Sequence, residues 1–234
     1  VSEKSIAQLI DDLKQTEPGV RRDAVYELAK RGDTSREVID AYLDPANDKD
    51  VQVRTQSLTA LSRAGDAAGW AVDALLGRMD DRDNQVRLRA ANAVGKIGEI
   101  AIEPLLEKWA NGSTGFKIAA CQAFQTMGPV AKPAVPVLLR AVQDQSSSAE
   151  RHSEEPGNRP RRRDRESGNG NAPSIARYAA SALVSIEPDN VDLLLTVAGG
   201  NDLETRLIGI SGLAALREPN SIVIDRLKQA AIDD

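Results

Sequence analysis

The chain has few of the residues that catalytic and metal sites depend on. Its 234 residues include one cysteine and one histidine, which excludes a disulfide framework, a thiolate zinc site and a histidine-rich metal centre within one chain. Aromatic residues make up only 3% of the chain although hydrophobic residues make up 41%, so Ala, Leu, Val and Ile must build the interior. This composition argues against β-sandwiches and barrels, which use aromatic and β-branched residues.

Long apolar runs and a strong charge of one sign are also missing. No stretch approaches 18 uninterrupted apolar residues, so we expect no helix that spans a membrane. Thirty basic and 35 acidic side chains give a net charge of −5, so bulk charge does not indicate nucleic-acid binding. Val1-Ser-Glu-Lys leads directly into an amphipathic segment rather than a signal peptide. We therefore favour the cytoplasm, while a processed or exported form stays open.

One motif recurs along the chain: an apolar or β-branched residue, usually followed by a base, and then small residues at helical spacing. Successive copies lie 33, 33, 30, 59 and 30 residues apart, so the long step indicates one repeat and an insertion of about 29 residues. The six copies begin at Val20-Arg21, Val53-Arg54, Val86-Arg87, Phe116-Lys117, Ile175-Ala176 and Thr205-Arg206.

Each copy of the motif predicts a helical hairpin. Apolar or small residues stand 0, 4, 7 and 8 places after the first residue of the motif, which is one stripe of a helix. A short turn with Gly or Pro follows, and then a second helix with paired apolar residues such as Leu75-Leu76. We predict six hairpins after one unpaired helix at roughly residues 4–14, in a single domain over residues 1–234. Such hairpins must stack, because none can bury its apolar faces alone.

The most regular copies resemble a known family. The segments Asp50-Val51-Gln52-Val53-Arg54, Asp83 to Gly98 and Asp202-Leu203-Glu204-Thr205-Arg206 are similar to HEAT repeats, particularly the short bacterial kind called PBS-lyase HEAT-like repeats. The tetratricopeptide repeat fits less well, because its Trp, Tyr and Pro positions are missing. The resemblance implies an all-α, right-handed α-solenoid whose second helices line the concave side.

An acidic residue stands four places before the base in four copies, as at Asp50 before Arg54 and Asp83 before Arg87. This spacing predicts a pair on one side of a helix start, with the acid near the positive end of the helix. The resemblance implies that such acids and bases form a ladder between adjacent repeats; an anion site is the alternative. The pattern is interrupted at Ser113 with Lys117 and at Ala176, where we expect the stack to be loosest.

The second helices carry acidic residues two places before or after the first residue of each apolar pair. We call six of them the acidic ridge: Asp11, Asp40, Asp44, Asp73, Glu103 and Glu107, with Asp192 in a later copy. Clustered charge steers partners of opposite charge, although exposed helix positions can also be charged for solubility alone. Trp70 is expected to be a partly exposed anchor for a partner. The ridge therefore predicts a non-catalytic, protein-binding scaffold that receives a basic segment of a protein partner. We expect the chain itself to be a monomer.

Residues 145–172 form a polar insertion with almost no apolar content, a composition that cannot repay its ordering entropy. Its centre is locally basic, so a neutral spacer, a contact with protein and a contact with nucleic acid are the alternatives; no interleaved aromatic residue supports base stacking. His152 lies in this insertion without a ligand set. The residues of the candidate loop contact are Arg159, Arg161, Arg162, Arg163 and Arg165.

The remaining residues give little indication of a catalytic function. Cys121 occupies a small-residue position of a first helix, which predicts a buried, inert thiol, and we expect no cofactor or metal. Deoxyhypusine hydroxylases resemble this architecture but hold iron with several His-Glu pairs, and HEAT-like DNA glycosylases use a basic groove, so neither matches. Bilin lyases share the repeat type, which leaves a tetrapyrrole lyase-like accessory protein as an alternative function.

Overall fold

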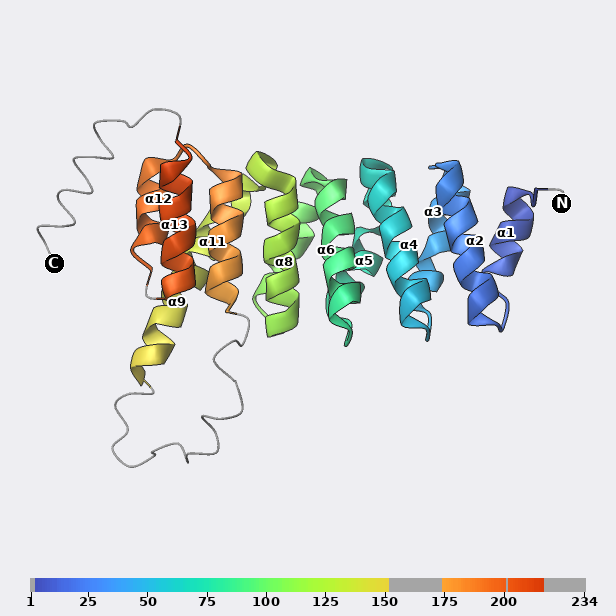
Figure 1. Ribbon diagram of the computed structural model, residues 1–234, viewed down its shortest axis with the longest axis horizontal. Helices are drawn as coiled ribbons and strands as arrows, with labels where there is room; N and C mark the ends of the chain where they lie inside the picture. Colours follow the sequence, from blue (N-terminus) through green and yellow to red (C-terminus); the bar gives the residue numbers. More distant parts are fainter. Residues whose placement is uncertain (1–2, 152–173, 201, 217–234) are drawn as a thin grey trace, which may run out of the picture. The chain divides into compact units, whose positions relative to one another are not determined.

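The computed structural model describes residues 3–151, 174–200 and 202–216. All regular elements in these ranges are helices (Figure 1), which confirms the predicted all-α class. The chain divides into two compact units, Val1–Ala131 and Lys132–Asp234, and each is described here by itself. The single domain over residues 1–234 therefore stays a prediction, as does the handedness of the repeat.

In the first unit, long first helices alternate with shorter second helices. The first helices lie side by side in chain order (Figure 1), and the second helices pack behind them. The first helices are α2 (Pro18–Arg31), α4 (Val51–Ala64), α6 (Asn84–Ile97) and α8 (Thr114–Met127). The second helices are α1 (Ile6–Asp12), α3 (Arg36–Leu43), α5 (Val72–Arg78) and α7 (Ile102–Trp109). The unpaired helix predicted at residues 4–14 is α1.

Three short 3-10 segments connect helices of this unit: η1 (Pro45–Asn47), η2 (Gly65–Ala71) and η3 (Glu99–Ala101). A fourth, η4 (Gly128–Ala134), follows α8 and extends beyond Ala131, the last residue of the unit. The four long helices stop at Gly32, Gly65, Gly98 and Gly128, all with positive φ. A residue with a Cβ adopts this conformation only at a cost. The glycines that the sequence placed in the turns therefore end the first helices.

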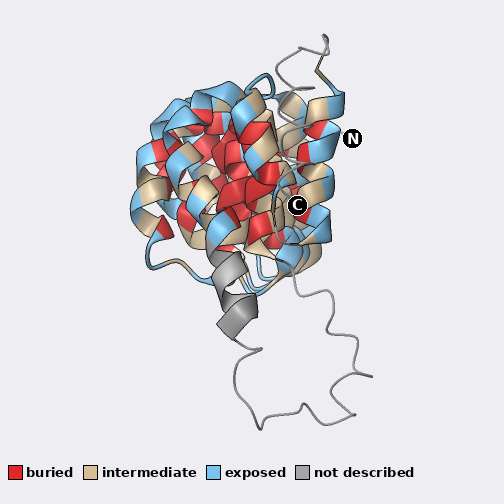
Figure 2. Cartoon of the chain, turned by 90° about the vertical axis from the view of Figure 1, so that its left-hand side faces the viewer, coloured by how far each residue is buried: buried red, intermediate tan, exposed pale blue. Residues whose placement is uncertain are grey.

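Small and aliphatic side chains form the core, as the composition predicted. Leu28, Leu61, Val94 and Phe124 stand at the same place in four successive first helices and are all buried. Figure 2 shows buried residues gathered between the helices and exposed residues on their outer sides. The close spacing of α6 and α8 depends on Gly95, because a Cβ there would lie 2.6 Å from the Thr126 Cβ. The predicted helical stripe is confirmed.

The second unit contains α9 (Val135–Arg151), α11 (Ile175–Ile186), α12 (Val191–Ala198) and α13 (Leu203–Ala214). α11 packs against α9 and α13, and α12 packs against α13. α9 continues through residues 145–151 of the predicted insertion, while residues 152–173 lie outside the described part of the chain. Residues 217–234, where the second helix of the sixth predicted hairpin would fall, also lie outside it.

Candidate functional site

The acids that precede the repeat bases cap helices. Asp50 Oδ1 accepts hydrogen bonds from the backbone N–H groups of Gln52 (2.9 Å) and Val53 (3.0 Å), and Asp83 does the same before α6. A short carboxylate at this position satisfies N–H groups that have no partner within the helix. The expectation that Asp50 and Asp83 themselves supply the acids of a ladder between repeats is therefore wrong, because both carboxylates cap helices.

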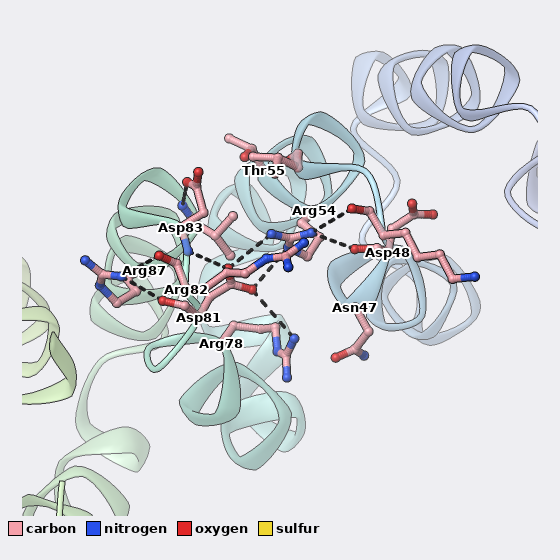
Figure 3. Close-up of polar contacts among 12 residues, drawn as sticks. Asn47, Asp48, Arg54, Thr55, Arg78, Asp81, Arg82, Asp83 and Arg87 are labelled. Carbon is pink, nitrogen blue, oxygen red and sulfur yellow. Dashed lines mark hydrogen bonds and ion pairs between the residues drawn. The ribbon is translucent and has the colours of Figure 1, made fainter. Parts of the chain in front are cut away.

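Arg21 and Arg54 pair instead with aspartates of the next inter-repeat loop, 27 residues further along. Figure 3 shows Arg54 with Asp81. Arg21 binds Asp48 through Nε (2.6 Å) and Nη2 (2.8 Å). Arg54 binds Asp81 with two 3.1 Å contacts, and their side chains are only 4% and 6% exposed. Two-pronged pairs of this kind fix relative position as well as charge. We call these pairs the arginine–aspartate ladder; they join α2 to the loop before α4, and α4 to the loop before α6.

The arginines of the repeat motif also hold the loops that precede their own helices. Arg54 Nη1 donates to the carbonyl oxygens of Asp48 (2.8 Å) and Lys49 (3.2 Å), and Arg87 Nη1 donates to that of Asp81 at 2.7 Å. One guanidinium thus orders two loops. The loop before α8 has Asn111 where the earlier loops have Asp48 and Asp81, so the ladder ends at Arg87, next to the interruption predicted at Ser113.

The ladder lowers the pKa of one of its carboxylates, Asp48. Burial by itself would raise the pKa of Asp48. The hydrogen bond from Arg21, that from the Asp50 N–H, and the charges of Arg21 and Arg54 outweigh burial and lower this pKa below its usual value. Asp48 therefore stays ionised in the folded chain, as a structural ion pair requires.

A depression of about 390 Å³ opens between these two loops. Its lining carries four cations and two carboxylates, Asp48 and Asp81, which already bind arginines. Arg78 also reaches Asp81 at 3.8 Å. Because both carboxylates of the lining pair with arginines of the preceding repeat, the cluster joins repeats. The lining residues are Asn47, Asp48, Lys49, Arg54, Arg78, Asp81 and Arg82.

All six residues of the acidic ridge lie on second helices of the first unit, or directly after one in the case of Asp44, and all are exposed. Asp11 lies 3.5 Å from Lys14, and Asp40 lies 3.4 Å from Arg36. The side chains of the other four have no hydrogen bond or ion pair within the described residues: Asp44, Asp73, Glu103 and Glu107. Asp192 is exposed on α12 in the second unit and is described apart from the ridge.

Trp70 lies in η2 and is 39% exposed. The Arg36 guanidinium carbon lies 3.7 Å from the centre of its ring, which is cation–π stacking. Ile100 is 64% exposed on η3, and a Cβ placed on Gly69 would lie 3.3 Å from its Cδ1. In two successive repeats an exposed apolar residue therefore stands three residues before a ridge carboxylate, Trp70 before Asp73 and Ile100 before Glu103.

The sequence analysis missed Arg36 and Ile100. Ile100 could have been found by aligning the second helices, because it stands at the place of Trp70 one repeat later. Arg36 could not, since its stacking depends on how two hairpins pack. Trp109, the other tryptophan of the chain, is buried in α7. His152 and the five loop arginines, Arg159 to Arg165, lie outside the described residues.

Cys121 is buried in α8, and burial raises the pKa of its thiol. A thiol kept protonated in this way is a poor nucleophile, which agrees with the predicted inert role. Within the described residues no group of His, Cys, Asp and Glu is arranged to hold a metal ion. No described helix is long and apolar enough to cross a membrane.

Two protein-family models match the repeats. A model for HEAT repeats matches residues 6–93, and a model for the PBS lyase HEAT-like repeat matches residues 86–108. Residues 6–108 therefore match models of HEAT repeats. The match to the PBS-lyase type falls on the third copy of the motif, where the sequence suggested it. No curated protein matches the chain.

Solved structures show the same fold. The complex of CpcE and CpcF of phycocyanin lyase from Nostoc sp. PCC7120 includes a chain with a TM-score of 0.51 and 21% identity, over 92% of this chain and 78% of that one. An engineered protein has a TM-score of 0.51 and 16% identity, over 91% and 98%. At these identities the likeness concerns the helical-repeat fold alone.

Proposed function

We propose that this HEAT-repeat chain is a non-catalytic protein-binding scaffold, and that its acidic ridge receives a basic segment of a protein partner. The observation that carries the proposal is the row of exposed carboxylates on successive second helices. Four of them have no side-chain partner within the described residues. Carboxylates that no internal cation neutralises attract a basic ligand over a Debye length of about 10 Å at moderate salt.

The surface also offers apolar contact, which charge alone cannot replace. An exposed ion pair contributes only about 0.2–1 kcal/mol, whereas aromatic residues often dominate the free energy of binding. Trp70 and Ile100 are exposed next to the charged row. A basic segment that lies along the ridge would therefore find both carboxylates and an apolar strip, which supports specific capture beyond electrostatic attraction.

The proposal is tested with a labelled peptide in which arginine alternates with serine, followed by fluorescence anisotropy at low and moderate salt. Replacing both Asp73 and Glu103 with lysine should weaken binding about tenfold, since two charge reversals each remove roughly 0.7 kcal/mol. The matched control is Asp23→Lys, because Asp23 is an exposed carboxylate on the first helix α2. Equal loss in ridge and control variants, or no loss, would refute the ridge as the binding surface.

A tetrapyrrole-handling accessory role is the second candidate, because the PBS-lyase repeat type brings it into consideration. Its test is a visible difference spectrum on mixing the chain with free bilin. A band shift that survives gel filtration would support this role, and an unchanged spectrum would argue against it. The chain is used whole, so that residues 145–172 take part in either result.

A further inference from the structure

One cation already occupies the acidic ridge, and its surroundings define a binding geometry. The Arg36 guanidinium stacks on Trp70 at 3.7 Å, and its Nε lies 3.4 Å from Asp40 Oδ2. An aromatic face below a guanidinium and a carboxylate at its edge are the two contacts that suit this planar cation best. Lysine would gain less from the same surface, because its ammonium is compact and strongly hydrated.

Arg36 is held weakly in this position. Its side chain is 67% exposed and that of Asp40 is 50% exposed, so water competes for both groups. Arg36 is also the first residue of α3, where the positive end of the helix dipole repels a cation. The contact can therefore open without disturbing the core, and the indole is then free to bind another guanidinium.

A partner's arginine would have an advantage that Arg36 lacks. Asp44 lies two helical turns after Arg36, and Asp73 lies one turn after Trp70. Arg36 pairs with neither of them in the structure. A basic segment that places one arginine on Trp70 can bring its next basic residues to these unneutralised carboxylates. The exchange thus replaces one weak internal contact with several contacts to the partner.

We infer that Trp70 and Asp40 form a subsite for an arginine side chain of the partner, and that Arg36 occupies this subsite in the free chain. The inference rests on the proposed function and adds the residue type that the ridge selects. Arg36 is then an internal competitor: the apparent affinity for the partner is reduced by the fraction of chains in which Trp70 is covered.

The test compares the arginine–serine peptide with a lysine–serine peptide on the whole chain. Arg36→Ala should bind the arginine peptide about fivefold more tightly, the gain expected if the internal contact covers Trp70 in about four chains of five. Trp70→Leu keeps an apolar side chain but removes the indole, and should abolish the preference for arginine over lysine. Binding should quench tryptophan emission in the wild type and not in Trp70→Leu, because Trp109 is buried.

Lys14→Ala is the matched control, since Lys14 is an exposed cation that pairs with the ridge carboxylate Asp11 and has no aromatic partner. If Lys14→Ala and Arg36→Ala raise affinity equally, bulk charge explains the gain and the subsite is refuted. If binding depends on Asp73 and Glu103 but ignores Arg36 and Trp70, the inference is wrong while the proposed function stands. If neither peptide binds the wild type or Arg36→Ala, both fail.

Discussion

Removing the carboxylate of Asp81 is the sharpest test of how these repeats are joined. In Asp81→Ala the buried guanidinium of Arg54 loses its two 3.1 Å contacts, and the Asp83 N–H loses its acceptor at 2.9 Å. Leaving one charge of a buried pair without its partner costs about 3–5 kcal/mol. We expect a loss of that size in the free energy that holds α4 and α6 together.

Stability must be measured helix by helix. Each repeat is stabilised by its neighbours and can unfold separately, so repeat proteins can depart from two-state unfolding. Amide hydrogen exchange of α4 and α6 should accelerate in Asp81→Ala, with much smaller changes in α1. Arg82→Ala is the control, because Arg82 is the adjacent, exposed residue; it should change stability by less than about 0.5 kcal/mol.

The double variant Arg54→Met with Asp81→Leu separates pairing from packing. Replacing a buried ion pair with apolar groups of similar volume is often neutral, so this variant should recover most of the stability that Asp81→Ala loses. The ladder would be refuted as the joint if Asp81→Ala cost less than about 1 kcal/mol, or if the effects of the two positions were simply additive.

Three further predictions concern other parts of the fold. Gly95→Ala should destabilise the α6–α8 contact by about 1–3 kcal/mol, because the new Cβ would lie 2.9 Å from the Ala123 carbonyl oxygen; Gly77→Ala, with nothing within 4 Å, should be neutral or stabilising in urea unfolding. Asp48 has a lowered folded pKa, so its contribution is present above the unfolded value of 3.8 and is lost as pH falls through the folded value; Asp48→Asn should flatten the acid branch of a stability–pH curve. Cys121 should react with a thiol reagent only after denaturation, since a rapid native reaction would contradict its burial and raised pKa.

Local features of this chain could be predicted from its sequence because they repeat. Leu28, Leu61, Val94 and Phe124 share one place in the motif, and helical period alone puts that place in the core. Glycine at the end of each first helix of the first unit follows from the cost of a positive φ for other residues. The acidic ridge was predicted from the same periodicity, and its six members are all exposed on one set of helices.

The contacts between repeats could not be predicted in the same way. Arg54 has two candidate acids, one four residues before it and one 27 residues after it. The spacing within one repeat drew attention to the first of them, Asp50. The structure uses Asp50 as a helix cap and places Asp81 of the next loop against the guanidinium. That choice depends on the distance between neighbouring hairpins, which no pattern within one hairpin contains. The stacking of Arg36 on Trp70, across two hairpins, has the same origin.

The end of the ladder at Arg87 gives the first unit two kinds of joint. The α2–α4 joint includes a half-buried arginine–aspartate pair and the α4–α6 joint a buried one, whereas the described α6–α8 joint has close apolar packing at Gly95 and no such pair. Ionic contacts weaken in acid, while apolar contacts weaken on cooling. Acid would therefore weaken the α2–α4 joint, which contains Asp48, whereas cold would weaken the α6–α8 joint, so the two conditions act on different places in the same unit.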